Sequence, residues 1–162
     1  MKIPLKVAAV ALVVLAGCYM LLPGASEAGQ PGQYKTAYGV VVYLGVKPAR
    51  VIKAQPQTYP ELHARGTIPR GRNDQYVSVA LFESSSGERI TDARVSARVS
   101  PIGLAGRERD LKPISIGGAV TYGNFFRLSS PDTYVIGVVI RQTKGGGQIR
   151  ARFEYRYYPS ER

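Results

Sequence analysis

Residues 134–157 read YVIGVVIRQTKGGGQIRARFEYRY, and this stretch decides the expected fold. Its first half is rich in Val and Ile, three glycines interrupt it at residues 145–147, and its second half alternates apolar and polar residues. Successive side chains of a strand point to opposite faces, so the alternation places an apolar row against a core and an arginine-rich row in solvent. The stretch therefore predicts an antiparallel hairpin.

Similar but shorter patterns occur earlier in the chain. Strands are expected at residues 40–44, 51–54, 76–82 and 95–99, with one or two more between residues 114 and 128 around a turn at residues 122–124. Residues 55–74 and 102–112 are expected to be loops, and nothing after Leu22 shows a sustained helical period. These patterns predict an all-β fold, an Ig-like antiparallel β-sandwich of about seven strands over residues 36–158, with a tail at residues 159–162.

The first 28 residues form a separate segment. Two lysines precede an uncharged, mostly apolar run over residues 7–22, a Pro-Gly pair ends the run, and Ser26 and Ala28 are small. This order is typical of a secretory signal peptide cut after Ala28, because signal peptidase needs small side chains at these two positions. A linker is then expected over residues 29–35.

Two other interpretations use the same N-terminal residues. Residues 15–18, Leu-Ala-Gly-Cys, match a bacterial lipobox, in which Cys18 is lipidated. Alternatively, residues 1–28 remain as an apolar export and anchor helix that attaches the domain to the membrane. All three interpretations place the domain outside the cytoplasm, in the periplasm of a bacterial envelope. Cys18 is the only cysteine, so no disulfide is expected in the domain.

Positive charge is the unusual feature of the composition. The chain holds 22 Lys and Arg residues against 11 Asp and Glu residues, a net charge of +11. Only Lys2, Lys6 and Glu27 of these lie in the first 28 residues, so nearly all of the excess belongs to the folded domain. A basic surface attracts anionic partners, although it also serves solubility alone.

The basic residues gather in two places. Arg150, Arg152 and Arg156 recur on the outward row of the last expected strand, where successive residues of the row lie about 7 Å apart and the three arginines span roughly 20 Å. Guanidinium groups bind carboxylates and phosphates, unless they only cover an exposed sheet face. The candidate binding residues for an anionic partner are Arg141, Lys144, Arg150, Arg152, Arg156 and Tyr158 in the hairpin, and Arg65, Arg70 and Arg72 in the long loop.

Two stretches resemble a known group of proteins. Residues 79–95 pass from a strand through an acidic turn and a glycine into Ile-Thr-Asp-Ala-Arg-Val, and residues 130–136 place Tyr134 at the start of a late strand. Over residues 76–158 the chain resembles small exported bacterial Ig-like and transthyretin-like β-sandwich proteins of the YtkA/FixH/CopC-like kind. The resemblance implies a Tyr134 hydroxyl bonded to nearby backbone. It also implies an alternative function, since some of these proteins handle copper or serve assembly of respiratory oxidases.

Residues typical of catalysis or metal binding are sparse. His63 is the only histidine, and Met1 and Met20 both lie in the export segment, so the His and Met ligands of copper-handling proteins have no counterpart. A lone histidine and no nucleophile motif argue against acyl-transfer chemistry. We expect no enzymatic activity, no cofactor, no metal site and no nucleic-acid partner. The sequence predicts an envelope accessory protein that docks through basic faces onto an acidic partner or an anionic membrane surface.

Overall fold

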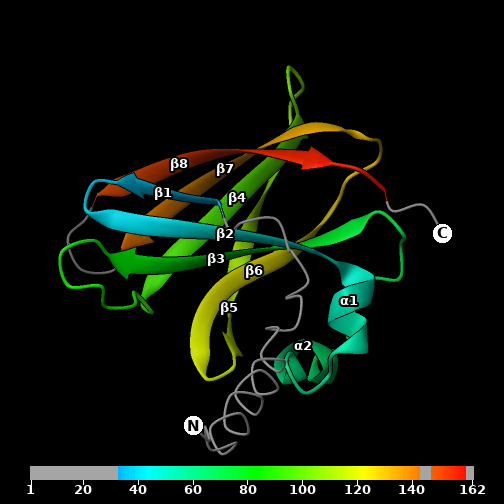
Figure 1. The fold of residues 1–162 in the computed structure, drawn as a ribbon, viewed down its shortest axis with the longest axis horizontal. Helices are drawn as coiled ribbons and strands as arrows, with labels where there is room; N and C mark the ends of the chain where they lie inside the picture. The colour runs from blue at the N-terminus through cyan, green and yellow to red at the C-terminus, as the bar shows by residue number, and fades with distance from the viewer. Residues whose placement is uncertain (1–32, 143–146, 160–162) are drawn as a thin grey trace, which may run out of the picture. The chain divides into compact units, whose positions relative to one another are not determined.

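The computed structural model describes residues 33–142 and 147–159 (Figure 1). The chain divides into the units Met1–Pro31 and Gly32–Arg162, and the fold below is that of the second unit. The predicted export signal, the lipidation of Cys18 and the position of Lys144 lie outside the described residues. Within the described part, no helix is long and apolar enough to span a bilayer.

The described residues form one antiparallel sheet of eight strands with two short helices (Figure 1). The order across the sheet is β1-β2-β3-β6-β5-β4-β7-β8. The elements are β1 (Gln33–Ala37), β2 (Val40–Pro48), α1 (Ala49–Ala54), α2 (Pro60–Ala64), β3 (Asp74–Glu83), β4 (Ala93–Pro101), β5 (Arg107–Ile116), β6 (Ala119–Arg127), β7 (Asp132–Gln142) and β8 (Gln148–Tyr157).

The sheet coils until its first and last strands come together. The side-chain amide of Gln33 in β1 donates a hydrogen bond of 2.8 Å to the carbonyl oxygen of Glu154 in β8. The all-β antiparallel prediction is confirmed, but in place of two stacked sheets the strands make one nearly closed, barrel-like sheet. The reason is β5, which pairs with β4 through residues 107–111 and with β6 through residues 112–116, and so joins the two halves.

Two apolar clusters stabilise this arrangement. The larger lies inside the coiled sheet, where Val77, Val79 and Leu81 of β3 are fully buried on the face that their alternation predicts. The smaller lies on the opposite face of β3, where Tyr76 packs with Ile52 of α1 and with residues of α2 and β5. The helices therefore cover part of the outer surface of the sheet.

The predicted C-terminal hairpin is confirmed, since β7 and β8 pair in register from Asp132 with Tyr157 to Arg141 with Gln148. The tyrosine contact implied by the resemblance is also present. The hydroxyl of Tyr134 donates to the carbonyl oxygen of Ser130 at 3.1 Å. This bond ties the start of β7 to the loop before it.

Other local predictions were wrong. Residues 51–54 belong to helix α1, and residues 60–64 of the expected loop form helix α2, because each helix is too short to show a 3.6-residue period. Residues 107–112 belong to strand β5, whose largely exposed residues lack the apolar alternation of a half-buried strand. β1 begins at Gln33, inside the expected linker.

The turn expected at residues 122–124 is also misplaced. Those residues lie inside β6, and the chain reverses instead at Gly117 and Gly118. Both glycines have positive φ, 57° and 80°, which residues with a side chain rarely adopt. The turn therefore falls where the backbone conformation requires glycine.

Candidate anion-binding groove

The outward rows of β4, β7 and β8 bring arginines together from distant parts of the sequence. Gly137 in the middle of β7 pairs with Arg98 of β4 on one side and with Arg152 of β8 on the other. Strands lie about 4.8 Å apart, so the two arginines start about 10 Å from each other with a glycine between them. On the outer surface, β7 thus forms a low floor at Gly137, and the arginines of β4 and β8 form a wall on each side of it.

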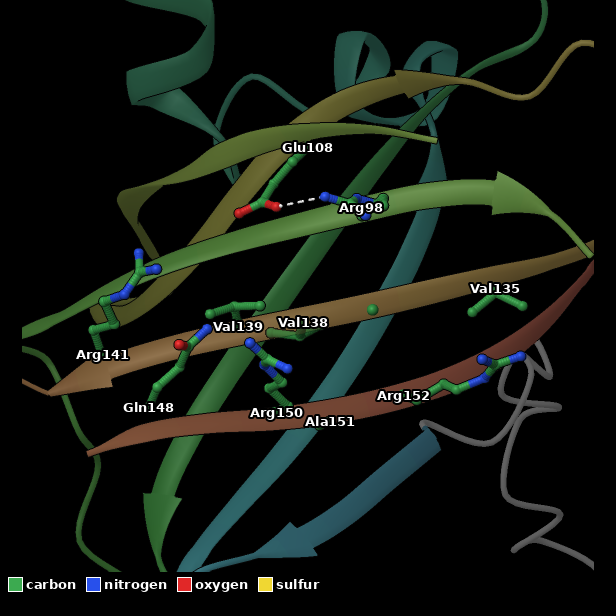
Figure 2. Close-up of a pocket in the computed structure, with 11 residues that line it drawn as sticks. Arg98, Glu108, Val135, Val138, Val139, Arg141, Gln148, Arg150, Ala151 and Arg152 are labelled. Atoms are coloured by element: carbon green, nitrogen blue, oxygen red, sulfur yellow. Dashed lines mark hydrogen bonds and ion pairs between the residues drawn. The ribbon is translucent and has the colours of Figure 1, made fainter. Parts of the chain in front are cut away.

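The next row along β7 continues the same pattern. Val139 pairs with Ser96 of β4 and with Arg150 of β8, and Arg141 follows one row further on β7. Arg150 and Arg152 therefore lie on one wall, and Arg141 lies at the end of the floor. Figure 2 shows the arginines of β8 on one side of β7 and Arg98 of β4 on the other.

These rows enclose an open groove of about 530 Å³ on the outer surface of the sheet. We call it the arginine groove. Its lining is basic at the walls and small or apolar along the floor. The lining residues are Arg98, Glu108, Val135, Gly137, Val138, Val139, Arg141, Gln148, Arg150, Ala151 and Arg152.

One carboxylate enters the groove, and it is already bound. Glu108 accepts a hydrogen bond of 2.7 Å from the hydroxyl of Ser96 and forms an ion pair with Arg98 at 3.1 Å. The Ser96 hydrogen bond, with smaller contributions from Arg98 and Arg141, lowers the pKa of Glu108 below its ordinary value. Glu108 is therefore ionised at neutral pH and orients Arg98 along its wall.

The other three arginines of the groove are not neutralised in this way. Among the described residues, no carboxylate lies within ion-pair distance of Arg141, Arg150 or Arg152. Three guanidinium groups that share one recess repel each other and attract an anion from solvent. The site is therefore suited to binding an anion.

The structure brings together Arg141, Arg150 and Arg152 of the predicted hairpin residues. Arg156 lies further along β8, opposite Thr133, and does not line the groove. Tyr158 follows the end of β8 with 68% of its surface exposed. The hairpin residues therefore divide into a groove set and a peripheral pair.

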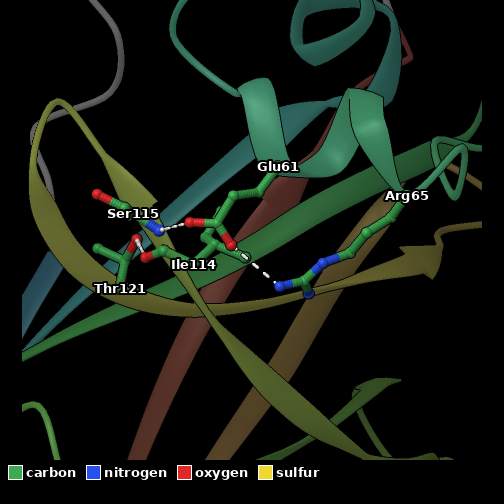
Figure 3. Close-up of polar contacts among 5 residues, drawn as sticks. All are labelled: Glu61, Arg65, Ile114, Ser115 and Thr121. Carbon is green, nitrogen blue, oxygen red and sulfur yellow. Dashed lines mark hydrogen bonds and ion pairs between the residues drawn. The ribbon is translucent and has the colours of Figure 1, made fainter.

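The second predicted cluster lies elsewhere. Arg65, at the end of α2, forms an ion pair of 3.0 Å with Glu61, and the other oxygen of Glu61 accepts 2.8 Å from the backbone N–H of Ser115 (Figure 3). The bond between Glu61 and Ser115 holds α2 against β5, and Arg65 pairs with the same carboxylate from the end of α2. Arg70 and Arg72 lie between α2 and β3, outside the arginine groove.

Sequence reasoning missed Arg98, Ser96 and Gly137. The alternation of polar and apolar residues in β4 shows that Arg98 and Ser96 point outward, but it does not show which strand lies beside them. The place of Arg98 in the groove, and of Ser96 beside Glu108, follows from the pairing of β4 with β7 over about 40 intervening residues. No pattern within a single strand contains that information.

The one histidine of the sequence, His63, contacts the backbone of the neighbouring helix. Its Nε2 lies 3.0 Å from the carbonyl oxygen of Ile52, so the ring bridges α2 to α1. Within residues 33–142 and 147–159, no three His, Cys, Asp or Glu side chains gather closely enough to hold a metal ion.

Solved structures show the same fold at low sequence identity. A DUF4426 family protein from Pseudomonas aeruginosa PAO1 matches with a TM-score of 0.63 and 21% identity, over 82% of this chain and 98% of that one. A copper-bound variant of FetP from uropathogenic Escherichia coli strain F11 matches with a TM-score of 0.60 and 12% identity, over 80% of this chain and 96% of that one. FetP from the same strain, recombinantly expressed in the periplasm and studied as isolated, matches with a TM-score of 0.61 and 12% identity, over 80% and 95%.

No family model and no curated protein matches the chain. At these identities the structural matches show the fold alone.

Proposed function

We propose that this protein is a non-enzymatic accessory protein of the bacterial envelope that binds an anionic partner through the arginine groove. One observation carries the proposal: Arg141, Arg150 and Arg152 line a single recess in which the only carboxylate among the described residues, that of Glu108, is held by Ser96 and Arg98. An acidic protein or an anionic membrane surface supplies the missing negative charge. The groove lies on strands that pack against the main core, so its walls are positioned before a partner arrives.

Two observations support an exported location. Residues 1–28 have the order of a secretory signal, with basic, apolar and small residues in succession. One protein of the same fold, FetP, was produced in the periplasm. We assign this chain to the same compartment, whether its leader is cleaved after Ala28, lipidated at Cys18 or retained as an anchor.

Removing the groove charges is expected to weaken binding to anionic membranes at least tenfold at low salt. The variant carries Arg141→Gln, Arg150→Gln and Arg152→Gln, and its retention is compared with the unmodified protein on phosphatidylglycerol vesicles over a salt series. Coulombic attraction is strongest at low ionic strength, because the Debye length is about 30 Å at 0.01 M and about 10 Å at 0.1 M. A parallel pull-down from envelope extract tests for an acidic protein partner.

A matched control removes the same charge from a different place. The variant Arg65→Gln, Arg70→Gln and Arg72→Gln also loses three positive charges, but none of these residues lines the groove. Both variants keep the N-terminal segment, so any membrane binding by that segment is equal in the two. Equal losses would show that net charge, rather than the groove, attracts the partner, and the proposal would fail.

The alternative function is metal handling or oxidase assembly, which the fold of the copper-bound FetP variant favours. We expect copper and zinc to bind no more tightly than they bind an unstructured peptide, since His63 already contacts the Ile52 carbonyl. Calorimetric titration of Cu(I), Cu(II) and Zn(II) into the purified protein measures this. Stoichiometric tight binding that His63→Gln abolishes would favour the alternative instead.

A further inference from the structure

We infer that the arginine groove is a phosphoryl-binding site, in which a phosphate group lies over Gly137 between Arg98 and Arg152. The inference rests on the proposed function, because it concerns the same groove, and it adds the chemical class of the ligand. It is built from the open space at Gly137, the positions of the surrounding donors and the charge of the recess.

The space exists because Gly137 has no side chain. A Cβ built at this position has no atom within 4 Å outside its immediate neighbours. The outward residues of β7 on either side of it are Val135 and Val139, which fill their own rows. The groove is therefore open above Gly137, in the row that also has an arginine on each neighbouring strand.

The donors surround this point from several directions. Arg98 starts beside Gly137 on β4, with one nitrogen paired to Glu108, and Arg152 starts beside it on β8, while Arg150 lies about 7 Å further along β8. A planar carboxylate has two oxygens and is satisfied by few donors, as Glu108 is by Ser96 and Arg98. A tetrahedral phosphoryl group presents oxygens in diverging directions, which suits guanidinium forks that come from opposite walls.

The charge of the recess points the same way. Four arginines and one glutamate line it, so its net charge is +3. A phosphate monoester carries nearly two negative charges at neutral pH on one compact group. A single carboxylate of a protein partner neutralises only one of the three. The groove thus favours a phosphoryl group, borne either on a lipid headgroup or on a free phosphate ester.

The test compares two small dianions on the full-length protein. Glycerol 3-phosphate is expected to bind at least tenfold more tightly than succinate by calorimetry, although the two carry similar charge. Gly137→Val fills the space above residue 137 without changing the charge. It is expected to weaken the binding of glycerol 3-phosphate at least tenfold. Gly137→Ala fills it less and is expected to give an intermediate loss, while Thr133→Val, on the outward row of the same strand, leaves binding unchanged. Melting temperatures establish that each variant is folded.

The outcomes separate this inference from the proposed function. The phosphoryl site is wrong if succinate binds detectably and as tightly as glycerol 3-phosphate, if Gly137→Val leaves the affinity unchanged, or if neither glycerol 3-phosphate nor phosphatidic acid vesicles bind. The proposed function still stands in that case if the variant lacking Arg141, Arg150 and Arg152 loses vesicle retention. In a second experiment, binding of the protein to phosphatidic acid vesicles is measured. Binding to these vesicles but not to glycerol 3-phosphate, lost in Gly137→Val, assigns the phosphoryl group to a lipid headgroup.

Discussion

Replacing Gly123 with alanine is expected to lower the free energy of unfolding by about 3 kcal/mol. Gly123 lies in β6, and a Cβ at this position overlaps the hydroxyl and the adjoining ring carbon of Tyr76. The ring cannot move aside, because it is 1% exposed and packs against Phe125 at 4.9 Å and Tyr59 at 6.3 Å between centroids. Urea unfolding of the two proteins measures the loss.

A second substitution tests the cause of that loss. The hydroxyl of Tyr76 is buried with no hydrogen-bond partner among the described residues, and burial raises its pKa above the ordinary value. Tyr76→Phe removes the nearest overlapping atom and leaves no polar group unsatisfied, so it is a clean background. We expect Gly123→Ala to cost about 1 kcal/mol less in this background. Equal costs in both backgrounds would show that the clash with Tyr76 is not the reason.

Replacing Phe153 with alanine is expected to cost about 3–5 kcal/mol of stability. Phe153 is 1% exposed in the main core and lies opposite Ile136 of β7. Truncation leaves a cavity on the inner side of β8, directly behind the strand that carries Arg150 and Arg152. Thermal unfolding measures the loss, and anion binding by the surviving folded fraction shows whether the groove depends on core packing.

Two comparison variants bracket the Phe153 result. Phe153→Leu keeps most of the apolar volume and is expected to cost about 1.5 kcal/mol. Tyr158→Ala, also at the C-terminal end of the domain, removes a side chain that is 68% exposed, and surface changes of this kind stay within about 0.5 kcal/mol. A loss at Tyr158 as large as that at Phe153 would contradict the assignment of the core.

The predictable parts of the fold are those in which the alternation of apolar and polar residues runs along a whole strand. Residues 148–157 alternate over their full length, so the hairpin and its outward arginines were visible in the sequence. β5 was not, because most of its residues are exposed on both faces and it contains Pro113. Closure of the sheet depends on how this strand divides its pairing between β4 and β6, so the sequence favoured two separate sheets.

The groove shows the same limit at the level of single residues. Arg150 and Arg152 were predicted because period-two spacing within one strand places them on one face. Arg98 and Gly137 join them only through cross-strand register. In the sequence, Gly137 is simply a residue of low strand propensity within an otherwise Val- and Ile-rich strand. Its contribution is the absence of a side chain, which has meaning only when the neighbouring strands are known.

The contact between Gln33 and Glu154 has a consequence for the behaviour of many copies together. An open sheet leaves unpaired amide and carbonyl groups along both of its outermost strands, and another molecule can extend the ladder there. In this protein those two strands face each other across a short gap, so each shields the other. At high local concentration the protein is in this way protected from polymerising through its own backbone.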